Sequence, residues 1–185
     1  MRSQEQDLFT LKNKVIVVTG ATGVLGGSFV EAISKQGATV VLIGQNELLG
    51  EERAAFIRSQ GGEALFLKAN VLVETELEVA KNKAVDTYGT IHGLVNGAGG
   101  NLPEGVLSPD QDVFTMNMEG MKKTMELNVW GTLLPVQVFG PAIAKSGVGS
   151  IVNISSVNSK RTVTRGLGYS MGKAAIDLYT KWFAV

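Results

Sequence analysis

Short apolar runs alternate along the chain with longer stretches of helical periodicity. The apolar runs, rich in β-branched residues, span residues 15–18, 39–43, 64–67, 93–95 and 150–154. Runs that are almost continuously apolar are typical of strands covered on both faces, as in a parallel sheet. The stretches of helical periodicity span residues 24–36, 46–60, 74–88, 110–145 and 168–184. This alternation predicts an α/β fold in which a doubly wound parallel sheet carries helices on both faces.

The chain has the length of a single domain, 185 residues, and we expect one domain over residues 1–185. Its longest loop is expected at residues 99–112, where Gly, Asn, Pro, Ser and Asp are frequent. The last helical stretch is still amphipathic where the sequence stops at Val185. We therefore expect the C-terminal strands of the sheet to be missing from this sequence.

Charge and composition argue against several classes of partner. Lys+Arg and Asp+Glu each number 17, so the formal net charge is zero and no basic field attracts nucleic acid or an anionic membrane. The longest apolar stretch, residues 129–144, is shorter than the ~20 residues of a membrane span. Cysteine is absent and His92 is the one histidine, so no metal site is expected. These features predict a cytoplasmic protein that binds a small molecule.

A glycine-rich turn follows the first apolar run. Gly20 permits a tight turn, Gly23 lets the backbone approach a pyrophosphate, and Gly26 allows close packing of helix on strand. Unpaired N–H groups at the N-terminus of the following helix can bind the phosphates. No Gly-Lys-Ser/Thr sequence follows, which argues against a P-loop. The turn predicts dinucleotide binding, and a tight turn without a ligand is the alternative.

The end of the second strand determines how the adenosine ribose of a dinucleotide is held. A carboxylate there hydrogen-bonds the 2′-hydroxyl of NAD, and a cation accepts the 2′-phosphate of NADP. Gly44 and Gln45 supply neither group, and no arginine is adjacent in sequence. The sequence leaves NAD and NADP open.

Groups able to transfer a proton occur near the end of the chain. Tyr169 and Lys173 lie four positions apart in a helical stretch and therefore share a helix face. An ammonium beside a phenol lowers the phenol pKa from its usual ~10, which suits a general acid and base at neutral pH. Ser156 follows the last strand, and residues 96–99 form a glycine-rich turn after another strand. We expect these groups at the edge of the sheet where ligands bind.

In combination, the motifs resemble the compact branch of the short-chain dehydrogenase/reductase family. The resemblance covers essentially the whole chain and rests on the glycine turn, Asn96-Gly97-Ala98-Gly99, Asn128, Ile154-Ser155-Ser156 and Tyr169-Ser170-Met171-Gly172-Lys173. It implies a Rossmann fold, NAD or NADP as cofactor, a homodimer or homotetramer, and hydride transfer between a secondary alcohol and a ketone.

The resemblance also implies a role for individual positions. Tyr169 would exchange a proton with the substrate oxygen, and Lys173 would hold the nicotinamide ribose and favour the phenolate. Ser156, rather than Ser155, would hydrogen-bond the reacting oxygen, and Asn128 would hold a water molecule in a proton relay. The positions that would contact the cofactor are Gly20, Thr22, Gly23, Leu25, Gly26, Gly44, Gln45, Asn70, Val71, Asn96, Gly97, Ala98, Tyr169 and Lys173.

Several positions depart from the pattern of the compact branch. The glycine turn has the Gly-x-x-Gly-x-x-Gly spacing of the epimerase-like branch. Asn70 stands where the family usually has Asp and could still bond the adenine amine, and Gly97 replaces a second Asn. Members of the family also continue for further strands that shape the substrate pocket.

The substrate suggested by the resemblance is a sugar acid or another small polyol. Residues 96–101 and 131–135 are similar to those of mannonate (fructuronate) oxidoreductases. Two alternatives remain, a nucleotide-sugar epimerase or dehydratase and a non-catalytic protein that binds NAD(P) and senses redox state. The first would turn over without net change in absorbance at about 340 nm, and the second would bind NAD(P)H without turnover.

Overall fold

A computed structural model describes residues 9–161 and 164–185. Five parallel strands form one sheet in the order β3-β2-β1-β4-β5. These strands are β1 (Val15–Thr19), β2 (Thr39–Gly44), β3 (Glu63–Lys68), β4 (Gly93–Asn96) and β5 (Ser150–Asn153). All five coincide with the apolar runs to within a residue or two, so the prediction of a parallel α/β sheet is confirmed.

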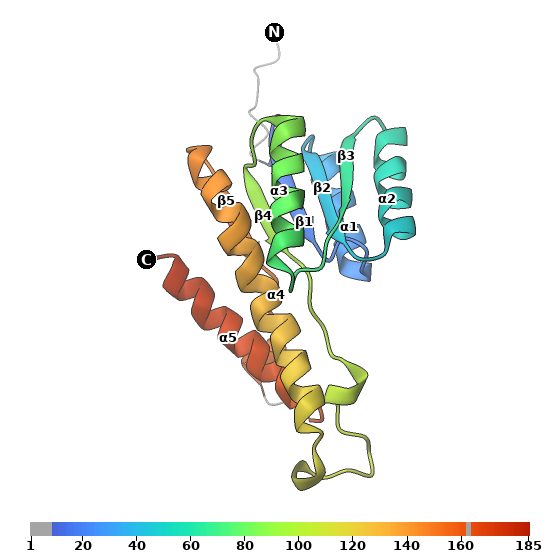
Figure 1. Cartoon of the computed structure of the whole chain (residues 1–185), viewed down its shortest axis with the longest axis vertical. Coiled ribbons are helices and arrows are strands. Elements are labelled where there is room, and N and C mark those ends of the chain that lie inside the picture. The colour runs from blue at the N-terminus through green and yellow to red at the C-terminus, as the bar shows by residue number, and fades with distance from the viewer. Residues whose placement is uncertain (1–8, 162–163) are drawn as a thin grey trace.

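Helices cover both faces of this sheet (Figure 1). Helices α1 and α2 pack on one face, and α3, α4 and α5 lie on the other. Their bounds are α1 (Val24–Lys35), α2 (Glu47–Ser59), α3 (Glu74–Tyr88), α4 (Met118–Lys145) and α5 (Leu167–Phe183). The molecule therefore has the three-layer arrangement of a doubly wound Rossmann fold.

Strand β2 shows why the apolar runs are continuous. Val41 and Ile43 point into the hydrophobic cluster that includes α3 and α4. Val40 and Leu42 point into the opposite cluster, which includes α1 and α2. All four side chains are fully buried, because alternate residues of a strand face opposite sides of the sheet. A strand covered on both faces needs an apolar residue at every position.

The fourth helical stretch was expected from residue 110, and this prediction is wrong. Asp112 instead caps a short 3-10 helix, Val113–Thr115, by accepting hydrogen bonds from two of its N–H groups. Helix α4 begins only at Met118, where the side chain of Asn117 accepts from the N–H groups of the first turn. Side chains that accept from nearby backbone N–H groups favour caps over helix interiors, so the loop expected at 99–112 extends to residue 117.

The direction of winding reverses between β1 and β4. The chain passes from β1 through β2 to β3, then crosses back to place β4 on the other side of β1. Thr19 and Asn96 are paired in register at the carboxyl ends of these two strands. Ligands of open parallel sheets bind at such a reversal, outside the carboxyl ends of the strands. The turns after β1 and β4 therefore lie together at the expected binding edge.

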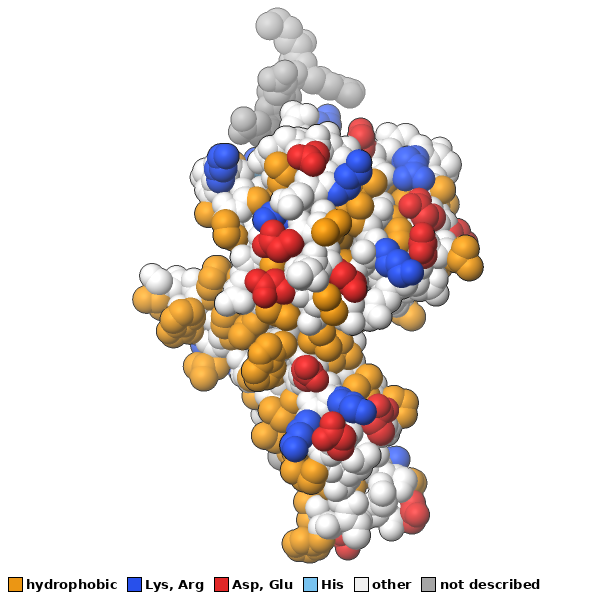
Figure 2. All heavy atoms as spheres, viewed as in Figure 1, with side chains coloured by type: hydrophobic (Ala, Val, Ile, Leu, Met, Phe, Trp, Pro, Cys, Tyr) orange, Lys and Arg blue, Asp and Glu red, His pale blue; other side chains and the backbone are white. Residues whose placement is uncertain are grey.

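Helix α4 extends beyond the sheet, and α5 packs along it (Figure 1). At 28 residues it meets the length and hydropathy of a membrane span, but half of its most apolar window is buried inside the protein, as in a core helix. Figure 2 shows hydrophobic side chains gathered where the two helices leave the sheet, while charged side chains of both signs lie over the part built on the sheet and over the end where α4 begins. Exposed members of this apolar surface are Trp130, Leu178, Trp182 and Phe183.

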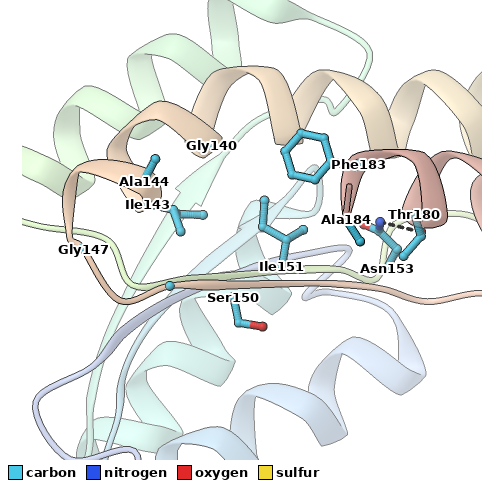
Figure 3. A pocket seen from close by; sticks show the side chains of 11 residues that line it. Gly140, Ile143, Ala144, Gly147, Ser150, Ile151, Asn153, Thr180, Phe183 and Ala184 are labelled. Carbon is cyan, nitrogen blue, oxygen red and sulfur yellow. Dashed lines mark hydrogen bonds between the residues drawn. The ribbon is translucent and has the colours of Figure 1, made fainter.

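Among the strands of the described residues, β5 lies at the edge of the sheet and pairs with β4 alone. Beside it, between the C-terminal parts of α4 and α5, is an open hollow of about 440 Å³ (Figure 3). Ile143, Ile151 and Phe183 line the hollow, and none of the predicted catalytic residues does. It is separate from the edge of the sheet where the candidate site lies.

Candidate active site

The turn after β1 is shaped by glycines that leave no room for a side chain. Gly20 has a left-handed φ of 66°, and a Cβ there would lie 2.7 Å from the backbone nitrogen of Ala98. A Cβ at Gly26 would collide with the carbonyl oxygen of Gly20. The first contact joins the turn after β1 to the turn after β4, and the second joins it to α1. The roles assigned to Gly20 and Gly26 as tight-turn and close-packing residues agree with this geometry.

The N-terminus of α1 is open to a ligand. Its cap residue, Gly23, provides no capping side chain, and the first turn contains no acidic residue. Val24 and Leu25 are 87% and 62% exposed at this turn. Unpaired N–H groups at a helix N-terminus favour an anion, and a carboxylate in the first turn would oppose it. This end of the helix therefore fits the pyrophosphate of a dinucleotide.

Arg53 of α2 forms hydrogen bonds to the glycine turn, and this contact was not predicted from the sequence. Its Nη1 donates hydrogen bonds to the carbonyl oxygens of Ala21 and Gly23, the latter at 2.6 Å. The guanidinium also lies against Gly27, where a Cβ would come within 2.7 Å of Cζ. Because Arg53 is 30 or more positions away from the turn, no local motif reveals this contact.

The adenosine end of the site is open at the end of β2. The side chain of Thr22 lies against Gly44, where a Cβ would come within 2.8 Å of the threonine Oγ1. Gln45, the next residue, is exposed. Thr22, predicted to contact the cofactor, therefore lies beside Gly44 at the strand end where the adenosine ribose was expected.

After β3, the side chain of Asn70 is held by a backbone hydrogen bond, whereas the side chain of Val71 is buried. The Oδ1 of Asn70 accepts a hydrogen bond from the backbone of Leu72 at 3.0 Å, which fixes the side-chain amide. One lone pair of that oxygen remains for a donor such as an adenine amine. The side chain of Val71 is buried and packs on α4 at Gly131, so only its backbone can face a ligand.

The turn after β4 combines a buried amide with two small residues. Asn96 is 1% exposed, and its Nδ2 donates to Oδ1 of Asn153 in β5 at 2.9 Å. Its own Oδ1 is buried without a hydrogen-bond partner among the described residues. At Gly97, a Cβ would lie 2.9 Å from the carbonyl oxygen of Thr19, which explains a glycine where the family has Asn. The N–H of Ala98 donates to Thr19 Oγ1 at 3.3 Å.

The proposed acid–base pair lies near the start of α5. Lys173 is 4% exposed, and its Nζ donates to the carbonyl oxygen of Ile154 at 2.7 Å. The same ammonium lies 5.7 Å from the ring centroid of Tyr169, which is half-buried. Burial lowers the pKa of Lys173 from its usual 10.5, and the charge of Asp177 opposes this effect. The predicted proximity of Tyr169 and Lys173 is thus present in the structure.

Asn128 joins α4 to the turn after β4. Its Nδ2 donates to the carbonyl oxygens of Thr124 and Gly100, and its Oδ1 accepts from Gly100 N–H at 3.1 Å. Both Asn128 Oδ1 and Lys173 Nζ face Gly99, where a Cβ would lie 2.7 Å and 3.3 Å from them. A side chain at residue 99 would therefore crowd both polar atoms, and glycine leaves the space open.

Ser156 lies just beyond β5 and begins a short 3-10 helix, Val157–Ser159. Its Oγ accepts a hydrogen bond from Asn158 N–H at 3.2 Å, and none of the described residues accepts its hydroxyl proton, which leaves that proton for a ligand oxygen. Ser156 is two residues from Ile154, whose carbonyl oxygen binds Lys173. The hydrogen bond between Lys173 and Ile154 therefore joins α5 to the segment that leads into Ser156.

His92 lies at the opposite end of β4. Its Nδ1 accepts a hydrogen bond from Val15 N–H at 3.0 Å, and burial lowers the histidine pKa. Over residues 9–161 and 164–185, no three His, Asp or Glu side chains form a cluster that could hold a metal ion.

Fold and site together define a protein of the Rossmann class, with a glycine turn at the reversal of the sheet and with Lys173 beside Tyr169 on α5. The model of the short chain dehydrogenase family matches residues 14–185. The chain belongs to the short-chain dehydrogenase family, and the resemblance noted from its motifs is confirmed.

Several relatives are similar over nearly all of the chain. An uncharacterised oxidoreductase of Haemophilus influenzae is 34% identical over 95% of this chain and 65% of its own length. The 7alpha-hydroxysteroid dehydrogenase of Clostridium sardiniense is 34% identical over 95% of this chain and 65% of its own length. The chain thus spans slightly less than two thirds of the length of these relatives.

Two solved structures agree closely with the fold. One is a provisionally assigned D-mannonate oxidoreductase from Haemophilus influenzae with bound NAD, with a TM-score of 0.87 and 34% identity over 95% of this chain and 66% of that chain. The other is an NAD+-bound xylitol dehydrogenase, with a TM-score of 0.86 and 25% identity over 94% of this chain and 64% of that chain.

Proposed function

We propose that the chain carries the cofactor-binding and proton-transferring machinery of an NAD(P)-dependent oxidoreductase that interconverts a secondary alcohol and a ketone. The observation that carries the proposal is the buried Lys173 ammonium. It contacts the Tyr169 ring on one side and the backbone two residues before Ser156 on the other. Over residues 9–161 and 164–185, no carboxylate forms an ion pair with this ammonium within 4.0 Å, although the charge of Asp177 acts on it. A buried ammonium is costly, so this arrangement is typical of a functional site.

The cofactor would lie across the carboxyl ends of β1, β2 and β4. The N–H groups after Gly23 would hold the pyrophosphate, and Thr22 and Gln45 would lie beside the adenosine ribose. Asn96 Oδ1, buried and without a partner among the described residues, offers an acceptor for a donor from a ligand. NAD, seen in the two related structures, and NADP both fit a strand end without a charge.

In the reaction, Tyr169 would give its hydroxyl proton to a carbonyl oxygen or take one from a hydroxyl. Ser156 would donate its free hydroxyl proton to the same oxygen, and Lys173 would favour the phenolate of Tyr169 by its charge. Asn128 would hold a water next to Lys173 and so connect the site to solvent. When bound, the nicotinamide cofactor supplies or accepts the hydride.

The substrate we propose is a sugar acid or polyol. Related structures include the provisionally assigned D-mannonate oxidoreductase and the xylitol dehydrogenase, and both names describe polyhydroxylated substrates. The apolar surface over α4 and α5 would be the subunit contact of a homodimer or homotetramer. We propose a cytoplasmic location without a nucleic-acid or membrane partner, in keeping with the zero net charge.

The test is a spectrophotometric screen of the full chain with NAD and NADP against hexonates, hexuronates, polyols and hydroxysteroids. We expect turnover with at least one polyhydroxylated compound and its loss, by about 10²-fold or more, in Tyr169→Phe with nearly unchanged NADH binding. Tyr88→Phe on α3, outside the site, is the matched control. NADH binding without turnover on the whole panel would favour a redox sensor, and turnover without absorbance change would favour an epimerase.

A further inference from the structure

Asp177 lies on α5 and has no part in the reaction proposed above. It follows Lys173 by four positions and Tyr169 by eight, so the three residues share a helix face. Its Oδ2 accepts a hydrogen bond from Ser159 Oγ at 2.6 Å and lies 2.7 Å from the Nζ of Lys160. The carboxylate side chain is only 19% exposed. Both partners belong to the segment that follows β5, and not to α5.

Ser159 links Asp177 to the backbone of Ser156 by hydrogen bonds. The N–H of Ser159 donates to the carbonyl oxygen of Ser156 at 3.1 Å. Its hydroxyl lies 2.8 Å from the same carbonyl oxygen and 2.6 Å from the Asp177 carboxylate. The single hydroxyl proton thus lies between two acceptors, and an ionised acceptor forms the stronger bond. Asp177 is therefore one residue removed from the backbone of Ser156.

Lys173 anchors the same segment from its other side. Its Nζ binds the carbonyl oxygen of Ile154, two residues before Ser156, whereas Asp177 binds Ser159, three residues after it. Two successive turns of α5 therefore hold the chain on both sides of Ser156. The first anchor is a group of the proposed reaction, and the second has no chemical role of its own.

We propose that Asp177 is a positioning residue, which holds the Ser156 segment against α5 and so sets the position of the Ser156 hydroxyl relative to Tyr169. Interactions with Lys160, Ser155 and Ser159, in that order of size, lower the pKa of the Asp177 carboxyl from 3.8 to about 2, so the anchor is ionised at neutral pH. The consequence for catalysis rests on the proposed function, but the effect on the segment does not.

The test compares Asp177→Asn, Asp177→Glu and Ser159→Ala with the wild-type chain. Asp86→Asn is the control, because Asp86 is an exposed aspartate on α3. Hydrogen exchange is measured at residues 157–161, where the N–H groups of residues 159, 160 and 161 bond to the carbonyl oxygens of residues 156 and 157. Turnover, KM and NADH affinity are measured on the same variants.

In Asp177→Asn we expect faster exchange confined to residues 157–161 and a fall in kcat of about tenfold to 10²-fold. KM for the substrate and the affinity for NADH should stay within about twofold, since neither ligand contacts Asp177 in the proposed arrangement. Asp177→Glu should restore part of kcat, and Ser159→Ala should reproduce most of the loss. Asp86→Asn should change neither quantity.

Unchanged exchange at residues 157–161 in Asp177→Asn would overturn the proposal, whatever the activity. A rise in exchange along all of α5, with loss of NADH binding and no selective effect on kcat, would also overturn it in favour of a general role in stability. If the wild-type chain reduces or oxidises no compound of the panel, the proposed function fails. In that case the exchange difference alone still decides whether Asp177 positions the segment.

Discussion

The two ends of the candidate site are built in different ways. Around Gly20, the site consists mostly of backbone, supplied by nine consecutive residues from 19 to 27 and shaped by the absence of side chains. Around Lys173, it consists of side chains from α4 and α5 and of backbone atoms from the segments after β4 and β5. The end around Gly20 therefore depends on the absence of side chains. The end around Lys173 depends on side chains and backbone atoms contributed by segments that are distant in sequence.

This difference predicts which properties of the protein a substitution at each end would change. A side chain added to the glycine turn meets rigid backbone, so the damage should spread to cofactor binding and to folding stability. A side chain removed from the Lys173 cluster leaves the sheet and helices intact, so the damage should be confined to the chemical step.

The largest effect should come from Gly20→Ala. At φ 66° any L residue is strained, and the new Cβ would lie 2.7 Å from Ala98 N, so we expect a loss of about 3 kcal/mol in the free energy of unfolding and no measurable NADH binding. Gly61→Ala is the matched control, because Gly61 has φ 80° and open space around it. It should lose only about 1 kcal/mol. Denaturant unfolding measures the stability of the two variants, and NADH fluorescence measures their cofactor binding. Equal losses of stability in Gly20→Ala and Gly61→Ala would show that the collision with Ala98 has no role.

Lys173→Met should separate catalysis from stability. We expect kcat to fall by about 10²-fold or more. The free energy of unfolding should change by about 1 kcal/mol or less, because loss of the hydrogen bond to Ile154 is offset by removal of a buried charge at similar volume. Lys181→Met, at an exposed position late in the same helix, is the control. A large loss of stability together with kcat, seen in thermal unfolding, would contradict the assignment of Lys173 to the chemical step.

Arg53→Gln should have a moderate effect at the glycine turn. Removing the guanidinium leaves the carbonyl oxygens of Ala21 and Gly23 without these donors, so we expect a loss of about 1–2 kcal/mol in stability and weaker NADH binding. Arg58→Gln, on the same helix but bonded to Ala64, is the comparison for NADH binding. Titration with NADH decides the point: equal affinities in the two variants would show that Arg53 does not support the cofactor turn.

The smallest effect is a pH dependence at Asp177. Its pKa in the folded chain, about 2, lies below the 3.8 of the free carboxyl, so its contribution to stability is present above about pH 4 and is lost as the pH falls through about 2. The difference in Tm between the wild-type chain and Asp177→Asn should therefore be constant near neutral pH and shrink between pH 4 and 2. Thermal unfolding by circular dichroism measures it; a difference that stays constant to pH 2 would argue against an ionised anchor.

Most of the sheet and the glycine turn could be predicted from the sequence because their signals are local. Continuous apolar runs reflect burial on both faces of each strand, and Gly20 and Gly26 stand where the backbone passes too closely for a Cβ. The start of α4 could not be predicted, because two capping side chains, Asp112 and Asn117, compete in a stretch without clear periodicity.

Spacing predicted Tyr169 and Lys173 as neighbours, and the position after a strand placed Ser156 at the ligand-binding edge. Asn128 and the role of each residue were predicted only through the resemblance to a family. Contacts that no motif marks were missed altogether. Arg53 reaches the glycine turn from another helix, Asn96 bonds across to Asn153, and Ser159 reaches Asp177 across 18 positions. Each of these contacts joins segments that only the packing of helices on the sheet brings together.

The strands, the glycine turn and the pairing of Tyr169 with Lys173 follow from local sequence, because each depends on residues within a few positions of one another. Only the packing of the helices places Lys173 and Asp177 within hydrogen-bond distance of the segment around Ser156. It also brings Arg53 to the glycine turn. The physical reason is that hydrogen bonds between distant segments depend on where whole helices pack, and no local pattern of residue types records that position.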